Sequence, residues 1–414
     1  MTRVSDPSAP RIAVVGATGA VGNTLIDLIE KRGFGYRDIH LVASARSAGT
    51  ELSVDGESHP VRAVDEFDFS TVDLAFFSAG TEASQQWVPR ATAAGAVVID
   101  NTIAFRMDPD SPLVVPQVNA HELDRRPKSG VIANPNCSTI PLVRLLKGVE
   151  QRWGVRQAVV STYQAASGLG HPGIDELKDA SRAALDHPDE AYPAKEFTPS
   201  LAFNVIPKID RFLDSGFTLE EQKMLQESRK ILGLPHLDVT TTCVRVPVVN
   251  GHSEAVWIET HGVVDRAELV EVLAGLPEVT VHDRESRHAF PTPATVDDPD
   301  RVHVGRVRVN PNNPRAFWLW LVADNLTIGA ALNAVQIAEE LVDRGTVTAT
   351  PPAGERLPPA VLKFGGSSFR TLTAYQQLAE ALSRRIEEEG TRLVVVVSGQ
   401  PGETEQFRER LSQV

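Results

Sequence analysis

The sequence predicts an α/β protein in three parts: a parallel sheet with covering helices, a larger α+β region, and a short βαβ segment at the C-terminal end. Short apolar stretches alternate with helical patterns up to about residue 138, which is the rhythm of a parallel sheet. The stretches 157–166, 237–249 and 253–260 are longer and alternate polar with apolar residues. That pattern favours a mixed or antiparallel sheet with one exposed face.

Composition narrows the range of functions. The 414 residues carry a net charge of −13, which argues against a surface that binds nucleic acid. No apolar run is long enough to cross a bilayer, and the first ten residues lack the apolar core of a signal peptide. Two cysteines do not make a disulfide framework, so we expect a cytoplasmic protein. We expect no metal site.

A glycine-rich turn follows the first predicted strand. Ile12 to Val15 run into the sequence GATGAVG, at 16–22, and then into an amphipathic helix. Backbone N–H groups at the start of that helix would face a pyrophosphate, and the helix dipole favours such an anion. The spacing is G-x-x-G-x-x-G, and a tight turn without a ligand is the alternative. The strand-turn-helix context favours a dinucleotide site.

The end of the second strand indicates which dinucleotide binds. A site for NAD usually carries an acidic residue there, which takes the ribose hydroxyls. This chain has Ser44, Arg46 and Ser47 instead. A guanidinium and two hydroxyls suit a 2′-phosphate, so the sequence predicts NADP(H). The alternative is that Arg46 is a solvated surface charge.

Cys137 lies in the stretch ANPNCSTIP, at 133–141. In a reducing compartment such a cysteine is either inert core or part of the chemistry. Beside a dinucleotide site it suggests thioester chemistry, in which the thiolate attacks an acyl group and hydride then reduces the thioester. Such a site needs a base, a carboxylate anchor and a group that stabilises the oxyanion.

Several polar residues are candidates for these roles. His252 could take the thiol proton, and Arg245 could bind a carboxylate through two parallel hydrogen bonds. Gln164 is a neutral polar residue on an otherwise apolar strand. Two further stretches could bind a charged ligand; they contain Arg106, Glu220 and Lys223. Taken singly, each residue also has a structural explanation, because a lone histidine or a lysine on a charged helix is more often structural or solvated.

From about residue 10 to 345 the chain resembles the aspartate-semialdehyde dehydrogenases. The resemblance rests on many short motifs in matching order. They are GATGAVG, SARSAG, FFSAGTEAS, FRMDPDSPLVVPQVN, NPNCST, STYQAASGLG, FNVIPKID, EEQKM, ESRKILGLP, TCVRVPVVNGHSEAV, VGRVR and ADNLTIGAALNAVQIAE. It implies reduction of L-aspartyl-4-phosphate by NADPH to L-aspartate 4-semialdehyde and phosphate, a step in the biosynthesis of diaminopimelate, lysine, threonine and methionine.

The resemblance also implies roles for individual residues. Cys137 would be the nucleophile, His252 the acid and base, and Gln164 a residue that orients the thioester. Arg245 would bind the α-carboxylate and Glu220 the α-amine. The other implied substrate contacts are Arg106, Lys223 and Asn136. The implied NADP contacts are Gly16, Thr18, Gly19, Ala20, Val21, Gly22, Ser44, Arg46, Ser47, Ser78, Ser167, Gly168 and Asn325. The resemblance further implies a homodimer or a tetramer.

Some positions depart from the pattern of that family. Ile103 stands where the family usually has a serine, Gln117 where it usually has a glutamate, and Leu326 and Thr327 where a basic pair is usual. Pro141 follows the cysteine loop, where a hydrophobic residue or glutamine is commoner. None of these changes removes a predicted catalytic residue, but they leave room for a different acyl donor.

The C-terminal segment resembles the start of an aspartokinase, an amino-acid kinase. It contains VLKFGGSSF, a helical pattern at about 371–389 and the strand RLVVVVSG, while most of a kinase domain is absent. A single βαβ unit cannot bury both faces of its sheet, so we expect no kinase activity. The segment could be a relic of a fusion, part of a longer bifunctional enzyme, or a docking segment for an aspartokinase partner.

We therefore expect four segments along the chain. Residues 1–138 would form the NADP-binding domain, completed by a helix at 325–345, and 139–324 the catalytic and dimerisation domain. A proline-rich linker at 346–360 would lead to the truncated kinase-like segment, 361–414.

Three rival functions remain open from the sequence. The first is an acyl-CoA reductase of the malonyl-CoA type, and the second is a reductase of a related acyl phosphate. The third is a non-catalytic scaffold or a subunit that partners a kinase, for which loss of the cysteine or the histidine would be expected. This chain retains both Cys137 and His252.

Overall fold

The computed structural model describes residues 9–187, 189–190, 192–282 and 290–347, and two strands further on at 360–364 and 393–397. The chain divides into two compact units, Met1–Ala349 and Thr350–Val414. Among the described residues, no helix is long and apolar enough to cross a membrane.

The first sheet of the larger unit has seven strands in the order β3-β4-β2-β1-β5-β6-β7. All pairings are parallel except β3 with β4, so the parallel sheet predicted from the alternating pattern is confirmed. The strands are β1 (Arg11–Val15), β2 (Asp38–Ala43), β3 (Glu51–Val54), β4 (Glu57–Ala63), β5 (Leu74–Phe77), β6 (Val97–Asp100) and β7 (Val131–Ala133). Helices α1 (Ala20–Arg32), α2 (Thr81–Ala93) and the short α3 (Pro116–Asn119) lie between them along the chain.

The second sheet has six strands in the order β11-β12-β13-β10-β8-β9. It is mixed, as predicted: β8 with β9 and β11 with β12 are parallel, and the other pairs are antiparallel. The strands are β8 (Val155–Gln164), β9 (Asp238–Arg245), β10 (His252–Thr260), β11 (Val279–Val281), β12 (Val302–Asn310) and β13 (Asn313–Ala323). One face of β8 is buried and the other, with Val159 and Tyr163, is exposed.

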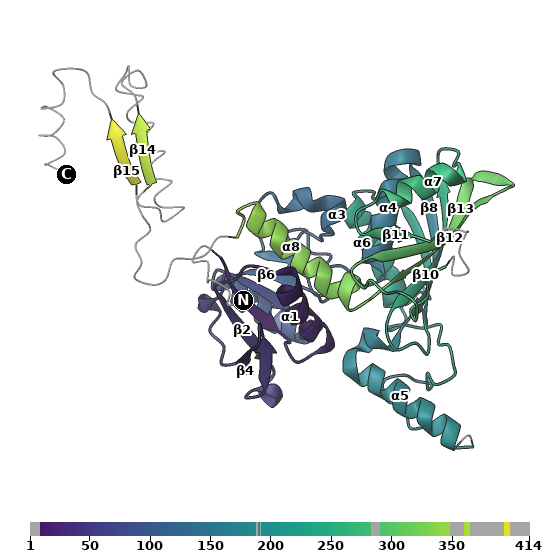
Figure 1. Cartoon of the computed structure of the whole chain (residues 1–414), viewed down its shortest axis with the longest axis horizontal. Helices are drawn as coiled ribbons and strands as arrows, with labels where there is room; N and C mark the ends of the chain where they lie inside the picture. Colours follow the sequence, from purple (N-terminus) through teal and green to yellow (C-terminus); the bar gives the residue numbers. More distant parts are fainter. Residues whose placement is uncertain are drawn as a thin grey trace, which may run out of the picture. The chain divides into compact units, whose positions relative to one another are not determined.

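Helices cover the buried face of the second sheet. Helix α4 (Thr139–Trp153) packs on β8 and β10, and α6 (Leu219–Leu232) packs on β9. Helix α5 (Gly170–Asp186) extends away from the sheet, and α7 (Arg266–Ala274) lies beside α4 (Figure 1). Helix α8 (Leu332–Asp343) lies beside α1 of the first sheet. The helix predicted at 325–345 begins instead as a π-helical turn, Thr327–Ala331.

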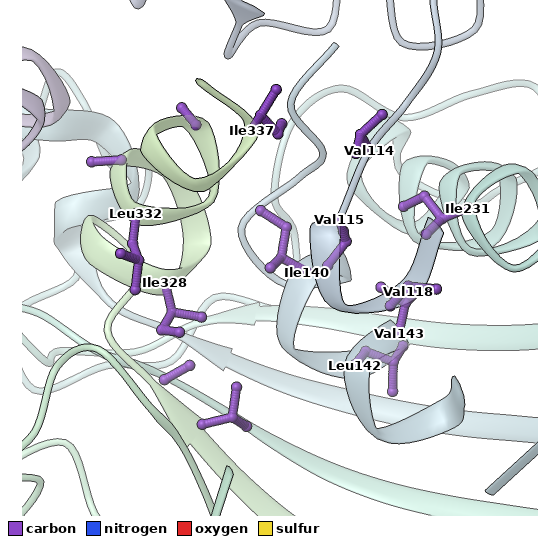
Figure 2. Close-up of a cluster of buried hydrophobic side chains, with 14 of the residues drawn as sticks. Val114, Val115, Val118, Ile140, Leu142, Val143, Ile231, Ile328, Leu332 and Ile337 are labelled. Carbon is purple, nitrogen blue, oxygen red and sulfur yellow. The ribbon is translucent and has the colours of Figure 1, made fainter. Parts of the chain in front are cut away.

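One apolar core joins the two sheets. Figure 2 shows Val115 and Val118 at α3, Ile140 and Val143 of α4, and Ile328 and Leu332 before and in α8 within one cluster of side chains. Burial of such side chains is the main favourable contribution to folding. The chain between β7 and α4 crosses from the first sheet to the helices of the second inside this core, so its position is fixed from both sides.

A buried polar network explains why Gln117 is tolerated. The guanidinium of Arg144, in the middle of α4, is buried and donates to the Glu278 carboxylate at 2.7 Å. Gln117 donates to Glu278 and to Gln336, at 3.1 and 2.9 Å. Glu278 therefore supplies the negative charge that the Arg144 side chain needs, and Gln117 supplies only hydrogen bonds.

The smaller unit is described only at two strands. β14 (Ala360–Phe364) and β15 (Leu393–Val397) pair in parallel, in agreement with the first and last strands of the predicted βαβ segment. The predicted helix at 371–389 lies outside the described residues.

Replacing Glu278 with glutamine should destabilise the protein by about 3 kcal/mol, because it leaves the buried Arg144 charge without a counter-charge. The free energy of unfolding from urea titration measures the effect. Glu268→Gln is the control, since Glu268 pairs with the half-exposed Arg152 and its loss should cost less than about 1 kcal/mol. Equal losses for the two variants would contradict the assignment.

Candidate active site

A cavity of about 670 Å³ lies where the carboxyl ends of the first sheet meet one edge of the second. Cys137 is in its wall. The other predicted catalytic and substrate residues in that wall are Arg106, Asn136, Gln164, Glu220, Lys223 and Arg245. The predicted cofactor residues in it are Val21, Ser78, Ser167, Gly168 and Asn325. The fold thus brings together residues that are far apart in the sequence.

The loop before α4 holds Cys137 in position. The side chain of Asn136 accepts a hydrogen bond from the N–H of Ser138 at 2.9 Å, which closes a turn around the cysteine. The π-helical turn packs against the other side of the loop. A Cβ atom on Gly329 would lie 2.8 Å from the Cβ of Cys137, so only glycine allows this close approach.

The thiol of Cys137 is protonated in the ligand-free protein. Burial, together with the Glu220 carboxylate, raises its pKa to about 12, against the opposing effect of Arg245, Arg106 and Lys223. The thiolate is the nucleophilic form, so a reaction at this sulfur needs a group that takes the proton.

Three residues lie together at one edge of the second sheet. Gln164 ends β8 and Arg245 ends β9, and the two are paired in register. His252 begins β10, the antiparallel neighbour of β8. The Arg245 guanidinium is buried and donates to the Ala165 carbonyl at 2.6 Å. The structure shows no carboxylate paired with it among the described residues, so this guanidinium is available to a carboxylate ligand.

His252 is buried just outside the cavity wall. Its Nδ1 accepts the N–H of Ala165 at 3.1 Å, while its Nε2 has no hydrogen-bond partner among the described residues. The proton of the neutral ring therefore sits on Nε2. Burial, and to a smaller extent the charge of Arg245, holds the pKa of His252 well below its usual range. In this state the ring is a hydrogen-bond donor at Nε2, and it can accept a proton only by giving up the Ala165 contact.

The predicted phosphate-binding cations are already paired. Lys223 contacts the carboxylates of Asp210 and Glu220 at 2.9 and 3.0 Å. Glu220 also accepts from Asn136 and Gln164. Its pKa is lowered, because these contacts and Lys223 outweigh its burial. Arg106 pairs with Glu227 at 2.9 Å.

The glycine turn shows the close packing that a dinucleotide site requires. Gly16 has φ of 93°, and a Cβ there would lie 2.4 Å from the carbonyl oxygen of Ser78. A Cβ on Gly22 would lie 2.1 Å from the Gly16 carbonyl oxygen, so α1 begins directly against the turn. Thr18 Oγ1 lies 3.4 Å from Ser47 Oγ, which brings the turn next to the end of β2.

The other predicted cofactor residues lie outside the cavity wall. Ser44 and Arg46 are exposed after β2. Ser47 follows Arg46 directly. The remaining predicted cofactor residues belong to the glycine turn or to the start of α1; they are Gly16, Thr18, Gly19, Ala20 and Gly22. An NADP molecule fits this set, because the helix start offers N–H groups to phosphates and Arg46 offers a charge to the 2′-phosphate.

The departures from the family pattern fall in different places. Ile103 and Leu326 are in the cavity wall, Thr327 is buried in the π-helical turn, and Gln117 belongs to the network around Arg144. Pro141 is in the first turn of α4, where proline is compatible with a helix. Only Ile103 and Leu326 can therefore contact a ligand in the cavity.

Several polar residues of the site were not predicted. Asn134 and Lys208 are in the cavity wall, and Glu227 is buried behind it. Glu227 lies seven residues after Glu220, on the buried stripe of α6. A charged residue on an otherwise buried stripe is a signal that sequence reasoning could have used. Cys243 is buried beside Met224, where it packs as a small apolar side chain.

Alkylation by iodoacetamide tests the protonation of Cys137. Below the thiol pKa the reactive fraction rises about tenfold per pH unit, so the rate in ligand-free protein should climb from pH 7 to 10 without a plateau. Arg245→Gln should slow it further, because Arg245 lowers the pKa of the thiol. Cys137→Ala gives the background from Cys243. A plateau near pH 8 would contradict the assignment.

Comparison with known proteins gives one consistent result. The family model described as the NAD binding domain of semialdehyde dehydrogenase matches residues 11–126, and the model of its dimerisation domain matches 146–328. Aspartate-semialdehyde dehydrogenase of Aquifex aeolicus is 44% identical over 338 residues, 81% of this chain and 99% of the relative. That of Bacillus subtilis is 44% identical over 340 residues, 80% of this chain and 96% of the relative.

Solved structures agree with these relatives. The structure of aspartate semialdehyde dehydrogenase II from Vibrio cholerae complexed with ASA has a TM-score of 0.77 at 43% identity, and the match covers 81% of this chain and 98% of that one. The Candida albicans enzyme with NADP has a TM-score of 0.64 at 25% identity, covering 82% and 100% of the two chains. This chain belongs to the aspartate-semialdehyde dehydrogenase family of NADP-dependent oxidoreductases.

Proposed function

We propose that this protein reduces L-aspartyl-4-phosphate to L-aspartate 4-semialdehyde and phosphate, with NADPH, through a thioester on Cys137. The observation that carries the proposal is the arrangement of charge around the thiol. Arg245 is buried with no carboxylate partner among the described residues, while Glu220 and Arg106 lie in the same wall. They match the α-carboxylate, the ammonium and the phosphate of the substrate.

The proposed reaction balances in two steps. The Cys137 thiolate attacks the acyl carbon, the bond to the phosphate oxygen breaks, and phosphate leaves. The residues of the glycine turn would hold NADPH, which would supply the hydride that reduces the thioester carbon. The resulting hemithioacetal then collapses to the aldehyde and the free cysteine.

His252 and Gln164 serve the tetrahedral intermediates in this proposal. The Nε2–H of His252 is a hydrogen-bond donor in the resting state and can stabilise the developing oxyanion. To accept the thiol proton the ring must lose its Ala165 contact. Gln164 is held by Thr162 and Glu220, at 3.0 and 3.1 Å, so its amide has a fixed orientation beside the acyl group.

We also propose that the protein is a homodimer. The exposed face of the second sheet carries Val159 and Tyr163, and Tyr163 packs on Trp320 with ring centroids 5.3 Å apart. Such a patch is typical of an interface, and the match to a dimerisation domain supports the same assignment.

Phosphate-dependent reduction of NADP⁺ tests the proposed reaction in reverse. Wild-type protein with aspartate semialdehyde should turn over only when phosphate is present, and Cys137→Ala should lose at least about 10³-fold in kcat, because the covalent step is gone. Absorbance at 340 nm follows the rate.

Replacing phosphate with coenzyme A in the same assay separates the acyl-CoA reductase from the proposed enzyme. Turnover with coenzyme A alone would overturn the proposal. If a protein that binds NADP shows no turnover with phosphate or with coenzyme A, the substitutions at Ile103 and Leu326 have changed the substrate.

For the smaller unit we propose a docking segment for an aspartokinase, which makes the proposed substrate. Its parallel strands are separated by residues 365–392, and parallel pairing needs a crossover of that order.

Removal of residues 350–414 should leave the kcat of the dehydrogenase within about twofold, because the cavity is built from the larger unit alone. It should lower the binding of a purified aspartokinase, measured by gel filtration of the mixture. Equal binding by the full and shortened chains would contradict docking, and a large loss of kcat would place the segment in the catalytic unit.

A further inference from the structure

One buried carboxylate contacts both the anion-binding arginine and the loop of the nucleophile. Glu227 is 1% exposed. Its Oε1 accepts from the guanidinium of Arg106 at 2.9 Å, and its Oε2 accepts from the backbone N–H of Asn136 at 2.7 Å. Asn136 immediately precedes Cys137. Both acceptor oxygens are therefore engaged, each with a different part of the site.

Helix α6 presents Glu227 together with Glu220. The two residues are seven positions apart, two turns of helix, and therefore lie on one face. Glu220 accepts from the side-chain amide of Asn136 at 2.9 Å, and Glu227 accepts from its backbone N–H. The residue before the nucleophile is thus held at two points by one rigid helix.

Arg106 is oriented by the same contact. Its Nε donates to the Asn134 carbonyl at 2.9 Å and one terminal nitrogen to the Asn101 carbonyl at 2.7 Å. A guanidinium has five N–H groups, so three are used inside the protein, counting the one on Glu227. Two remain for an anion in the cavity, in a plane that these three contacts fix.

We propose that Glu227 is a positioning residue for this reaction: its single carboxylate fixes the phosphate-facing plane of Arg106 and, at the same time, the backbone in front of Cys137. The proposal rests on the proposed function in so far as Arg106 receives the phosphate. It adds a residue that touches neither substrate nor cofactor and acts through two that do.

Replacement of Glu227 with glutamine disturbs one of the two contacts. Both partners of the carboxylate are donors, and an amide has only one acceptor oxygen, so its NH₂ must face a donor. We expect the KM for phosphate to rise about tenfold, because the variant loses one charge-assisted hydrogen bond and this loss corresponds to about a tenfold change in affinity. The rapid first turnover without phosphate, which reports acylation of Cys137, should slow as well, while the KM for aspartate semialdehyde should change less than about threefold.

A double-mutant cycle shows whether Glu227 acts through Arg106. Arg106→Lys should raise the KM for phosphate, because lysine cannot keep the three contacts that orient the guanidinium. If Glu227 positions Arg106, adding Glu227→Gln to Arg106→Lys should not raise the KM for phosphate further, although it should still slow the first turnover. Independent, multiplying effects on the KM would overturn the coupling.

Glu221→Gln is the matched control on the same helix. Glu221 caps α6 and accepts from the N–H of Cys243, away from the cavity wall. Its loss should lower the Tm without changing the KM for phosphate. If Glu227→Gln does not fold, Glu227→Asp keeps the charge but shortens the reach, and it should show the same KM shift. An unchanged KM in either folded Glu227 variant would contradict positioning, and tighter phosphate binding would mean that Glu227 is only a counter-charge.

Inorganic phosphate gives a readout that does not depend on turnover. It should raise the Tm of wild-type protein, and Glu227→Gln should need about tenfold more phosphate for the same shift. If the wild-type protein is inactive but the two proteins still differ in the phosphate concentration that gives the same Tm shift, the proposed reaction is wrong and the positioning role is supported. Equal shifts for both proteins, with an active wild type, would overturn the positioning role alone.

Discussion

The loop from Ala133 to Thr139 is the constraint on which the rest of the site depends. It leaves the last strand of the parallel sheet and enters α4, which packs on the second sheet. Because the apolar core of Figure 2 surrounds its two ends, the two sheets cannot shift relative to one another without moving Cys137. The shape of the cavity between the sheets is determined by that packing. Gly329 allows the π-helical turn to pack directly against the loop.

The net positive charge that the cavity offers to a ligand is smaller than the number of its cations, because buried cations are paired with carboxylates. Lys223 and Arg106 each contact a carboxylate, and unpaired charges at such positions would be costly to bury. These two side chains therefore offer directed hydrogen bonds more than net charge. Arg245 differs, because its contact is a backbone carbonyl. A carboxylate ligand that binds there would supply the missing counter-charge, which gives the site a physical reason to select an α-carboxylate.

The sequence predicted those parts of the fold that depend on local patterns. The glycine turn, the strands of the parallel sheet and the alternating strands β8 and β10 follow from periodicity and turn chemistry. Glu227 escaped prediction because its role depends on a pairing between α6 and residues about ninety positions earlier. The π-helical turn escaped for a similar reason: its residues read as ordinary helix, and only the close approach to Cys137 requires another geometry.

The state of Cys137 and His252 suggests how the reaction is confined to the complex with substrate. The thiol has a raised pKa and His252 holds its proton on Nε2, so the ligand-free site has neither a thiolate nor a free base. Arg245 lowers the pKa of both groups, but for His252 it acts alongside burial, whereas for the thiol it opposes burial. A carboxylate bound to Arg245 would remove that charge and strengthen His252 as a base. The same binding event would also remove a charge that lowers the pKa of the thiol. Proton transfer to His252 would still require the ring to leave Ala165. In the proposed enzyme, therefore, the thiol has no base in His252 while the ring keeps its Ala165 contact.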